Sequence, residues 1–287
     1  QAVTYLLLKD IFPQNAVDLG MMKKNSIIHK YFTRREKNLY DVSDFIGCMS
    51  QANVDYVLRN NKSVSVEKIE VCPNSIRPSE RESSFELIKK TRNAYNVPLN
   101  STVFLYGGNL GLPQGIDFLV SVLEANKEKK DVFFIIVGSG TEQARLKRSV
   151  EALHMSNCSM FDFMQKSDYL DLLFASDVGL IFLSKNFTIP NFPSRILDYM
   201  DASLPVLAAT DKNTDMGRII ATNQFGYWCE SGDIESFNEY IDALSSAEHL
   251  RKSLGRNAKN FLINNYTTKH SCEIILRHFR HPEEATR

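Results

Sequence analysis

The sequence lacks an excess of charge of either sign. Lys and Arg together number 34, and so do Asp and Glu, so the formal net charge at pH 7 is zero. Nucleic-acid binding usually depends on a broad positive field, and this composition provides none. We therefore expect no nucleic-acid partner, and we expect any anionic ligand to be bound by local groups.

Cysteine is scarce, and long apolar runs are absent. The five cysteines are scattered and form no CxxC pair, which argues against a disulfide framework and a zinc site. They are Cys48, Cys72, Cys158, Cys229 and Cys272. No apolar run approaches the ~20 residues that cross a bilayer, and no signal peptide is recognisable. These absences indicate a reducing, cytoplasmic environment.

Short apolar runs alternate with amphipathic patterns, which is typical of an α/β fold with a parallel sheet covered by helices. Strands are expected over 4–8, 45–50, 68–72, 102–107, 132–138, 158–162, 178–183, 205–209 and 225–229. Helices are expected over 27–41, 51–60, 84–95, 114–127, 141–154, 167–175, 194–202, 214–221 and 234–244, and two more over 247–279.

The polar stretch "PNSIRPSERESS" (73–84) interrupts this alternation and predicts a domain boundary. Residues 76–265 contain six expected strands and are predicted to form a complete, doubly wound Rossmann-like domain. The sequence begins at Gln1 close to an expected strand. We therefore expect residues 1–75 to be the C-terminal part of a second Rossmann-like domain whose beginning is missing.

Residues 103–115 ("VFLYGGNLGLPQG") place Gly107, Gly108, Gly111 and Gly115 between a strand and a helix. Glycines there let the backbone approach a ligand closely, and the next helix start favours an anion. The pattern is neither GxGxxG nor a Walker sequence, which disfavours dinucleotide and P-loop functions. A tight turn without a ligand is the alternative.

Residues 135–151 repeat the order strand, Gly-x-Gly, helix, with Gly138 and Gly140. Such turns are common, so a purely structural role explains this stretch when it is taken alone. In an open parallel sheet, however, loops at the carboxyl ends of strands beside a switch in strand order form one crevice. The two glycine loops are therefore candidates for a shared site.

The stretch "FPSRILDYMDASLPVLA" (192–208) predicts a third wall of that site. Pro193 and Ser194 are typical of a helix start. If Ser194 caps the helix, the first-turn amides are free for phosphate oxygens, and Arg195 adds a positive charge. Asp198, about one turn along, can accept hydrogen bonds from a ribose diol. Its alternative role is to complement the helix dipole.

Residues 21–40 combine basic and apolar side chains on one expected helix. The basic residues are Lys23, Lys24, Lys30, Arg34, Arg35 and Lys37. Such a helix suits an anionic membrane surface. The simpler explanation is a solvated face opposite a core-packing face.

In order and spacing, these stretches resemble retaining glycosyltransferases of the GT-B class, in the group 1, family-four-like set that builds bacterial capsule and O-antigen polysaccharides. Further segments that carry the resemblance are "LLLKDIFPQNAVDLGMM" (6–22) and "DYLDLLFASDVGLIFL" (168–183). The resemblance implies two Rossmann-like domains facing a cleft, with the acceptor on the N-terminal side and the donor on the C-terminal side. It also implies that residues 266–287 form a helix that crosses back to the first domain.

The resemblance implies a donor site as well. Gly107, Gly108 and Asn109 would lie against the donor diphosphate, and Gly138 is a further donor-binding candidate. Ser194 and Arg195 would cap it, with Arg195 as the catalytic group, and Asp198 stands where the family usually has a glutamate that binds ribose.

The chain departs from the family pattern at several positions. Many relatives clamp the diphosphate with an Arg and a Lys, where this chain has Asn109 and Gln114. Charge neutralisation then falls on Arg195, with Lys166 and Lys185 as candidate helpers. A glutamate that often stands eight residues before the ribose acid is replaced by Pro190.

The implied activity is metal-independent transfer of a sugar, with retention, from a nucleotide-diphosphate-sugar to a glycan or lipid-linked acceptor. It belongs to surface polysaccharide biosynthesis in the cytoplasm or at the inner face of the membrane. No cofactor besides the donor is expected, and no carboxylate pair has the spacing of a metal-binding DxD motif. A nucleotide-sugar epimerase of the same fold and a catalytically degenerate binding subunit are the alternatives.

Overall fold

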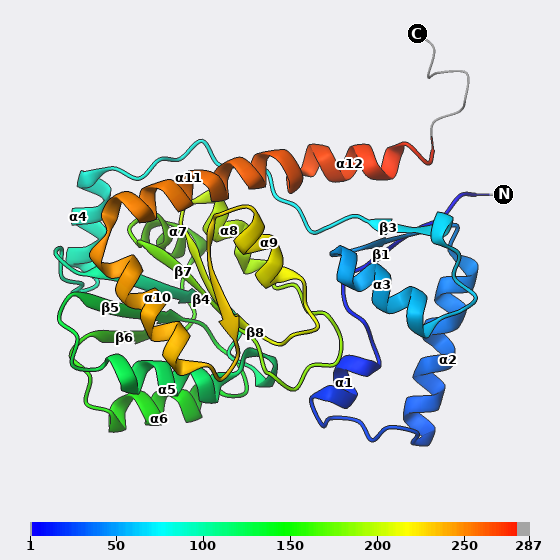
Figure 1. Ribbon diagram of the computed structural model, residues 1–287, viewed down its shortest axis with the longest axis horizontal. Coiled ribbons are helices and arrows are strands. Elements are labelled where there is room, and N and C mark those ends of the chain that lie inside the picture. Colours follow the sequence, from blue (N-terminus) through cyan, green and yellow to red (C-terminus); the bar gives the residue numbers. More distant parts are fainter. Residues whose placement is uncertain (1, 280–287) are drawn as a thin grey trace, which may run out of the picture.

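Two parallel β-sheets organise the protein, and the computed structural model describes residues 2–279 (Figure 1). The first sheet has the order β1-β2-β3, with β1 at Tyr5–Leu8, β2 at Phe45–Cys48 and β3 at Ile69–Val71. Its helices are α1 (Gln14–Asp18), α2 (Ile27–Val42) and α3 (Gln51–Asn60). Val54 and Val57 of α3 pack with Tyr40 and Ile46 in a small core, so this lobe has its own hydrophobic centre.

The second sheet has the order β6-β5-β4-β7-β8-β9, and all its strands are parallel. Its strands are β4 (Thr102–Gly107), β5 (Val132–Val137), β6 (Cys158–Phe161), β7 (Val178–Phe182), β8 (Val206–Thr210) and β9 (Gly226–Glu230). Every residue of β4, β5, β7 and β8 is buried, which explains their continuous apolar sequences.

The strand order reverses between β4 and β7. From β4 the chain proceeds outward to β5 and β6, and it then returns to β7 on the other side of β4. In open α/β sheets, ligands bind outside the carboxyl ends of the strands at such a switch point. The segments that follow β4 and β7 are therefore the ones that the topology brings to a binding crevice.

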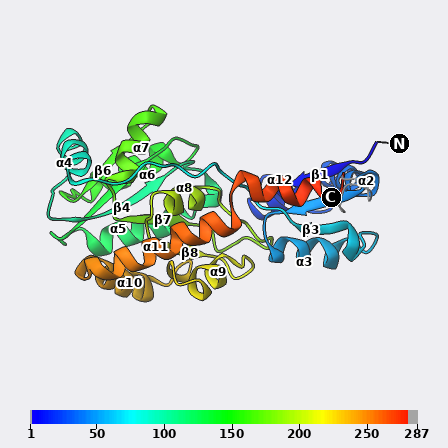
Figure 2. The same cartoon turned by 90° about the horizontal axis from the view of Figure 1, so that it is seen from above.

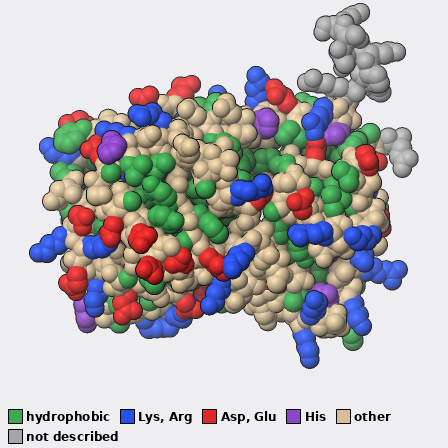
Figure 3. Space-filling view, viewed as in Figure 1, with side chains coloured by type: hydrophobic (Ala, Val, Ile, Leu, Met, Phe, Trp, Pro, Cys, Tyr) green, Lys and Arg blue, Asp and Glu red, His purple; other side chains and the backbone are tan. Residues whose placement is uncertain are grey.

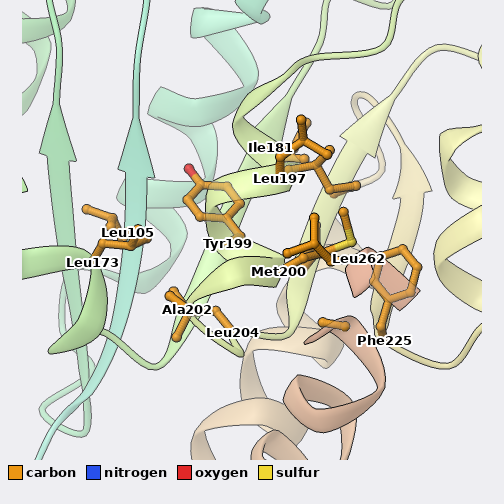
Figure 4. Packing of buried hydrophobic residues seen from close by; sticks show 14 of the residues in the cluster. Leu105, Leu173, Ile181, Leu197, Tyr199, Met200, Ala202, Leu204, Phe225 and Leu262 are labelled. Atoms are coloured by element: carbon orange, nitrogen blue, oxygen red, sulfur yellow. The ribbon is translucent and has the colours of Figure 1, made fainter. Parts of the chain in front are cut away.

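Helices cover both faces of the second sheet. One face carries α5 (Ile116–Asn126), α6 (Gln143–Ala152) and α10 (Ile234–Ser246). The other carries α4 (Phe85–Ala94), α7 (Lys166–Phe174), α8 (Arg195–Asp201), α9 (Met216–Thr222) and α11 (Glu248–Asn265). Figure 4 shows the hydrophobic core between the second sheet and this second set of helices, where Leu197, Tyr199 and Met200 of α8 lie near Ile181 of β7 and Leu262 of α11.

The last described helix, α12 (Thr268–Leu276), extends from α11 over the first lobe (Figure 2). The Ser271 hydroxyl donates to the Pro73 carbonyl at 3.3 Å, and the His278 ring stacks on Phe45 with 3.8 Å between centroids. Arg277 forms an ion pair with Glu70 of β3. Of the residues 266–287 that were expected to form a helix crossing back to the first domain, α12 is the part that contacts the first lobe. Residues 280–287 lie outside the described part of the chain.

The two lobes also meet beside the crevice. Phe187 and Ile189, which follow β7, are buried against Ile11 of the first lobe. The Asn53 side-chain amide donates to the Pro190 carbonyl at 2.9 Å. The segment between β7 and α8 is therefore held by the first lobe.

The expected strands and helices are confirmed, with boundaries that differ by one or two residues at most ends. The sequence patterns missed α1, because a helix of five residues is too short to show a helical period. Residues 73–84 join the two sheets as an extended connection along one edge of the molecule (Figure 1).

Candidate functional site

A cavity of about 670 Å³ lies at the carboxyl end of the second sheet, at the strand-order switch. The loops after β4, β5 and β6, the start of α8 and the connection between the lobes line it. The seven residues predicted as a donor site all border it; they are Gly107, Gly108, Asn109, Gly138, Ser194, Arg195 and Asp198. The structure therefore brings three separate sequence stretches to one place.

A buried tyrosine joins the glycine loop to α8. The amide of Gly107 donates to the Tyr199 hydroxyl at 3.0 Å, and this hydroxyl donates to the Leu180 carbonyl at 3.1 Å. Tyr199 is fully buried, and a Cβ at Gly179 would lie 2.3 Å from its ring. The two walls of the cavity are thus held at a fixed separation.

The two glycine loops are hydrogen-bonded to each other. The amides of Gly108 and Leu110 donate to the carbonyls of Val137 and Ser139, both at 2.9 Å. A Cβ at Gly138 would lie 1.8 Å from the Gly108 carbonyl oxygen, so this position requires glycine on steric grounds. Gly138 therefore acts by letting the loops approach each other.

These bonds correct one expectation about the first glycine loop. The amides of Gly107 and Gly108 already donate to protein acceptors, so they are not free for a ligand. In the described part of the chain, the amide of Asn109 has no acceptor. Asn109 is thus the residue of this trio that can offer a backbone N–H to an anion.

The expected cap of α8 is also wrong in detail. Ser194 has helical backbone angles (φ −64°, ψ −19°) and makes no capping bond; its hydroxyl accepts from the Asn74 amide at 2.6 Å. The amides of Ile196 and Leu197 donate to the carbonyls of Pro193 (3.3 Å) and Ser194 (3.0 Å). Of these first-turn amides, that of Arg195 is the one with no acceptor among the described residues.

Arg195 reaches from α8 to the glycine loop. Its Cζ lies 4.4 Å from the centroid of the Tyr106 ring, and its Nη2 donates to Gln114 Oε1 at 3.0 Å. Nη1 is buried and has no hydrogen-bond partner within residues 2–279. A buried donor without an acceptor is costly, so an anion that reached this nitrogen would be favoured.

Asp198 faces the cavity from the first turns of α8. Its carboxylate accepts no hydrogen bond from any described residue, and so both oxygens are available to a ligand. Burial raises the pKa of this carboxyl above its ordinary value, and Asp201 raises it further, whereas Lys166 lowers it. The raised pKa shows that the ionised carboxylate is poorly compensated by its surroundings.

The sequence matches the family described as "Glycosyl transferases group 1" over residues 88–261. The chain belongs to this family. The matched segment contains the cavity walls formed by β4, β5 and α8.

Curated relatives of this group 1 chain agree with the family. It is 26% identical over 273 residues to the probable glycosyltransferase WbjE of Pseudomonas aeruginosa, covering 93% of this chain and 66% of the relative. It is 26% identical over 133 residues to the putative colanic acid biosynthesis glycosyl transferase WcaI of Escherichia coli K12, covering 46% of this chain and 32% of the relative. The chain thus spans two thirds or less of the length of these relatives.

Solved structures show the same fold. HepE of Anabaena, solved in complex with UDP, superposes with a TM-score of 0.78 at 18% identity, covering 96% of this chain and 72% of HepE. The glycosyltransferase WaaG, involved in lipopolysaccharide biosynthesis, superposes with a TM-score of 0.69 at 15% identity, covering 96% of this chain and 75% of WaaG. The GT-B fold expected from the sequence is confirmed.

Several cavity residues of the group 1 chain were missed at the sequence level. Tyr106 lies under the Arg195 guanidinium, Tyr169 and Phe163 line the cavity, and Asn74 holds Ser194. Tyr106 directly precedes the glycine loop, but a tyrosine in an apolar strand reads as core. The candidate helpers Lys166 and Lys185 are exposed and do not line the cavity.

Proposed function

We propose that the cavity binds the diphosphate of a nucleotide-sugar and that the protein transfers the sugar, with retention, to a glycan or lipid-linked acceptor in surface polysaccharide synthesis. The observation that carries the proposal is Arg195. It is the one cationic side chain among the described residues that line the cavity, and its buried Nη1 lacks a partner. The HepE structures with UDP and with UDP-glucose support a donor of this class.

In the proposed reaction, the bond between the anomeric carbon and the β-phosphate oxygen breaks as negative charge develops on the diphosphate. The acceptor hydroxyl attacks the same face of the sugar, through a state with oxocarbenium character, and its proton passes to the departing diphosphate oxygen. Arg195 stabilises that charge, because a preorganised donor aimed at developing negative charge lowers the barrier of such a reaction. The amides of Asn109 and Arg195, which have no acceptor among the described residues, are candidates to assist it.

The proposal assigns leaving-group stabilisation to the protein without a metal ion. Among residues 2–279, no group of three or more His, Cys, Asp or Glu side chains is arranged to hold one. Transfer that persists in excess EDTA is the expected result. Loss of transfer in EDTA and recovery with Mg²⁺ or Mn²⁺ would contradict this part of the proposal.

Thermal shift with nucleotide-sugars tests the proposed function. A ligand that binds only the native state raises the melting temperature, so one of UDP-glucose, GDP-mannose, ADP-glucose and TDP-glucose should stabilise the chain. Because Asp198 is proposed to hold both ribose hydroxyls, TDP-glucose should be the weakest. No shift with any nucleotide would contradict the proposal.

Product analysis distinguishes a glycosyltransferase from a nucleotide-sugar epimerase. A transferase consumes the donor only when an acceptor is present, and NMR of the product should show the anomeric configuration of the donor. A new sugar nucleotide formed from the donor alone would identify an epimerase instead.

Replacing Asp198 with Asn should weaken nucleotide binding and stabilise the fold. Loss of charge-assisted hydrogen bonds to the ribose should cost ~1–3 kcal/mol of binding free energy. At neutral pH the melting temperature should rise, because an ionised carboxylate with a raised pKa destabilises the folded state.

Two controls make this prediction specific. The difference in melting temperature should disappear as the pH falls below the ordinary value of 3.8, where Asp198 is protonated in both the folded and the unfolded chain. The variant should also show a smaller preference for the ribonucleotide over its 2′-deoxy form, because the amide keeps only one acceptor oxygen and no charge. If that preference is unchanged, Asp198 does not bind the ribose.

We also propose that α2 contacts an anionic membrane surface from the cytoplasmic side, which suits a lipid-linked acceptor. Its Ile27, Ile28 and Tyr31 are 88%, 60% and 58% exposed. Four exposed basic residues lie on α2 and exposed Lys23 and Lys24 come just before it, and Figure 3 shows Lys and Arg side chains gathered over this side of the first lobe. None of the helices in residues 2–279 is long and apolar enough to cross a bilayer.

Vesicle binding tests this surface. Converting Lys23 and Lys24 to Gln should reduce binding to vesicles with 30% phosphatidylglycerol by about 30-fold, since each basic residue near such a surface contributes ~1 kcal/mol. Lys89 and Lys90 of α4, also exposed, provide a control with the same change in charge. Equal losses in both variants would contradict a surface on α2.

A further inference from the structure

The guanidinium group of Arg195 is confined on several sides. Some of its contacts restrict the plane of the group, and another sets its rotation within that plane. The Tyr106 ring, 4.4 Å from Cζ, supports the guanidinium plane, and the Tyr106 hydroxyl donates to the Asn109 carbonyl at 2.8 Å. A Cβ at Gly108 would lie 3.2 Å from Cζ and Nη2. These contacts restrict the plane of the guanidinium, but a ring face does not set its rotation within that plane.

Gln114 supplies the contact that sets this rotation. Its Oε1 accepts from Arg195 Nη2 at 3.0 Å, and the other terminal nitrogen, Nη1, is left without a protein acceptor. A hydrogen bond to a guanidinium nitrogen is directional, because the five N–H groups have a fixed fork geometry. Holding Nη2 therefore decides where Nη1 points.

The backbone holds Gln114 firmly. It ends a one-turn 3₁₀ helix, Leu112–Gln114, and its amide donates to the Gly111 carbonyl at 3.0 Å. Gly115 follows with φ 55°, where a Cβ would lie 2.8 Å from the Leu183 carbonyl oxygen. Gln114 is only 8% exposed, so its side chain has little freedom to leave Arg195.

The chemistry of the glutamine amide suits this position. A carboxylate at residue 114 would also hold Nη2, but it would neutralise the guanidinium. A lysine would offer no acceptor and would repel it. The neutral amide orients Arg195 and leaves its charge for a ligand, in a cavity whose described lining otherwise carries the acids Asp162 and Asp198.

We propose that Gln114 is a positioning residue: it directs Arg195 Nη1 toward the diphosphate of the donor and preserves the full charge of the guanidinium. This inference rests on the proposed function. It explains how a crevice with one arginine accommodates a diphosphate.

Two substitutions separate orientation from charge. Gln114→Met keeps the length of the side chain but removes the acceptor, whereas Gln114→Glu keeps an acceptor and cancels the charge. Gln51→Met on α3, outside the cavity, controls for the substitution itself. Calorimetry of the chain with UDP and UMP, or with the pair for the base selected by thermal shift, measures the contribution of the β-phosphate.

A hydrogen bond to a charged group corresponds to about 10- to 100-fold in affinity. We expect UDP affinity to fall about 10-fold in Gln114→Met and about 100-fold in Gln114→Glu, while UMP affinity changes less than 3-fold in either. The Gln114→Glu melting temperature should not fall, because the new carboxylate pairs with Arg195.

The outcomes are distinguishable. If the wild-type chain prefers UDP over UMP and both Gln114 variants keep that preference, the positioning role is overturned and the proposed function stands. Parallel losses of UDP and UMP affinity would indicate a purely structural role for Gln114 and would also overturn it. If the wild-type chain binds neither nucleotide of any pair, the proposed function fails, and this inference fails with it.

Discussion

Replacing Arg195 with Ala should lower the rate of the proposed sugar transfer about 10²- to 10³-fold, which is the typical loss when one preorganised donor to a developing negative charge is removed. Arg195 is the one cation in the described lining of the cavity, so no neighbouring side chain can replace its charge. Arg195→Lys should recover only part of the loss, because an ammonium lacks the planar fork that Tyr106 and Gln114 hold. Turnover per folded molecule is the measurement.

A second buried arginine provides the matched control. Arg92 is 4% exposed and binds Asp177 at 2.6 Å and the Ala175 carbonyl at 2.9 Å. Because every one of these partners is structural, Arg92→Ala should lower the melting temperature more than Arg195→Ala and leave turnover per folded molecule intact. The reverse pattern, with stability lost and turnover kept in Arg195→Ala, would reduce Arg195 to a packing role.

Replacing Gly138 with Ala should separate the two glycine loops. The new Cβ would lie 1.8 Å from the Gly108 carbonyl oxygen, a distance that no rotamer change can relieve. Overpacking of this kind costs ~1–3 kcal/mol, and here the shift must move the loop that carries Asn109. We expect a lower melting temperature and at least a 10-fold loss of nucleotide affinity, measured at a temperature where the variant is folded.

Gly226→Ala is the control for that experiment. A Cβ at Gly226 would lie 1.9 Å from the Val206 carbonyl oxygen, a nearly identical clash at the amino end of β9, and Gly226 does not line the cavity. This variant should lose a similar amount of stability but keep its nucleotide affinity. Similar losses of affinity in both variants would mean that the Gly138 effect is one of global stability.

Most of the fold could be predicted from the sequence because its signals are local. Buried parallel strands such as "TVFLYG" and "VFFIIV" must be apolar along their whole length, and each is followed by glycine or polar residues at its carboxyl end. The three stretches of the cavity could be identified for the same reason. Their convergence depends on the strand order, which places the segments after β4 and β7 together.

The finer features of the site could not be predicted, because they depend on contacts between distant residues. Whether a loop amide is free depends on its neighbour: the amide of Gly108 is occupied by Val137, whereas that of Asn109 has no described acceptor. The prediction of a Ser194 cap was wrong because Ser194 has helical backbone angles; its hydroxyl instead accepts from Asn74, in the connection between the two sheets. At the sequence level, Gln114 was noticed only because many relatives have a lysine at this position.

Two of the departures from the family pattern make contacts of their own in the structure. Gln114 binds Arg195, and the Pro190 carbonyl is bound by Asn53 of the first lobe. The Gln114 contact depends on its side chain, whereas the Pro190 contact uses a backbone carbonyl that any residue would supply. A degenerate subunit that had lost its donor site would have no reason to keep a buried, oriented guanidinium, so the Gln114 contact favours an active donor site.

The most direct test is a crystal structure of the chain with the nucleoside diphosphate that gives the largest thermal shift. We predict that a β-phosphate oxygen lies ~2.7–2.9 Å from Arg195 Nη1, the usual length of a charge-assisted hydrogen bond, with the ribose hydroxyls on Asp198. A nucleotide bound elsewhere, or bound in this cavity with Nη1 still lacking a phosphate contact, would contradict the donor site.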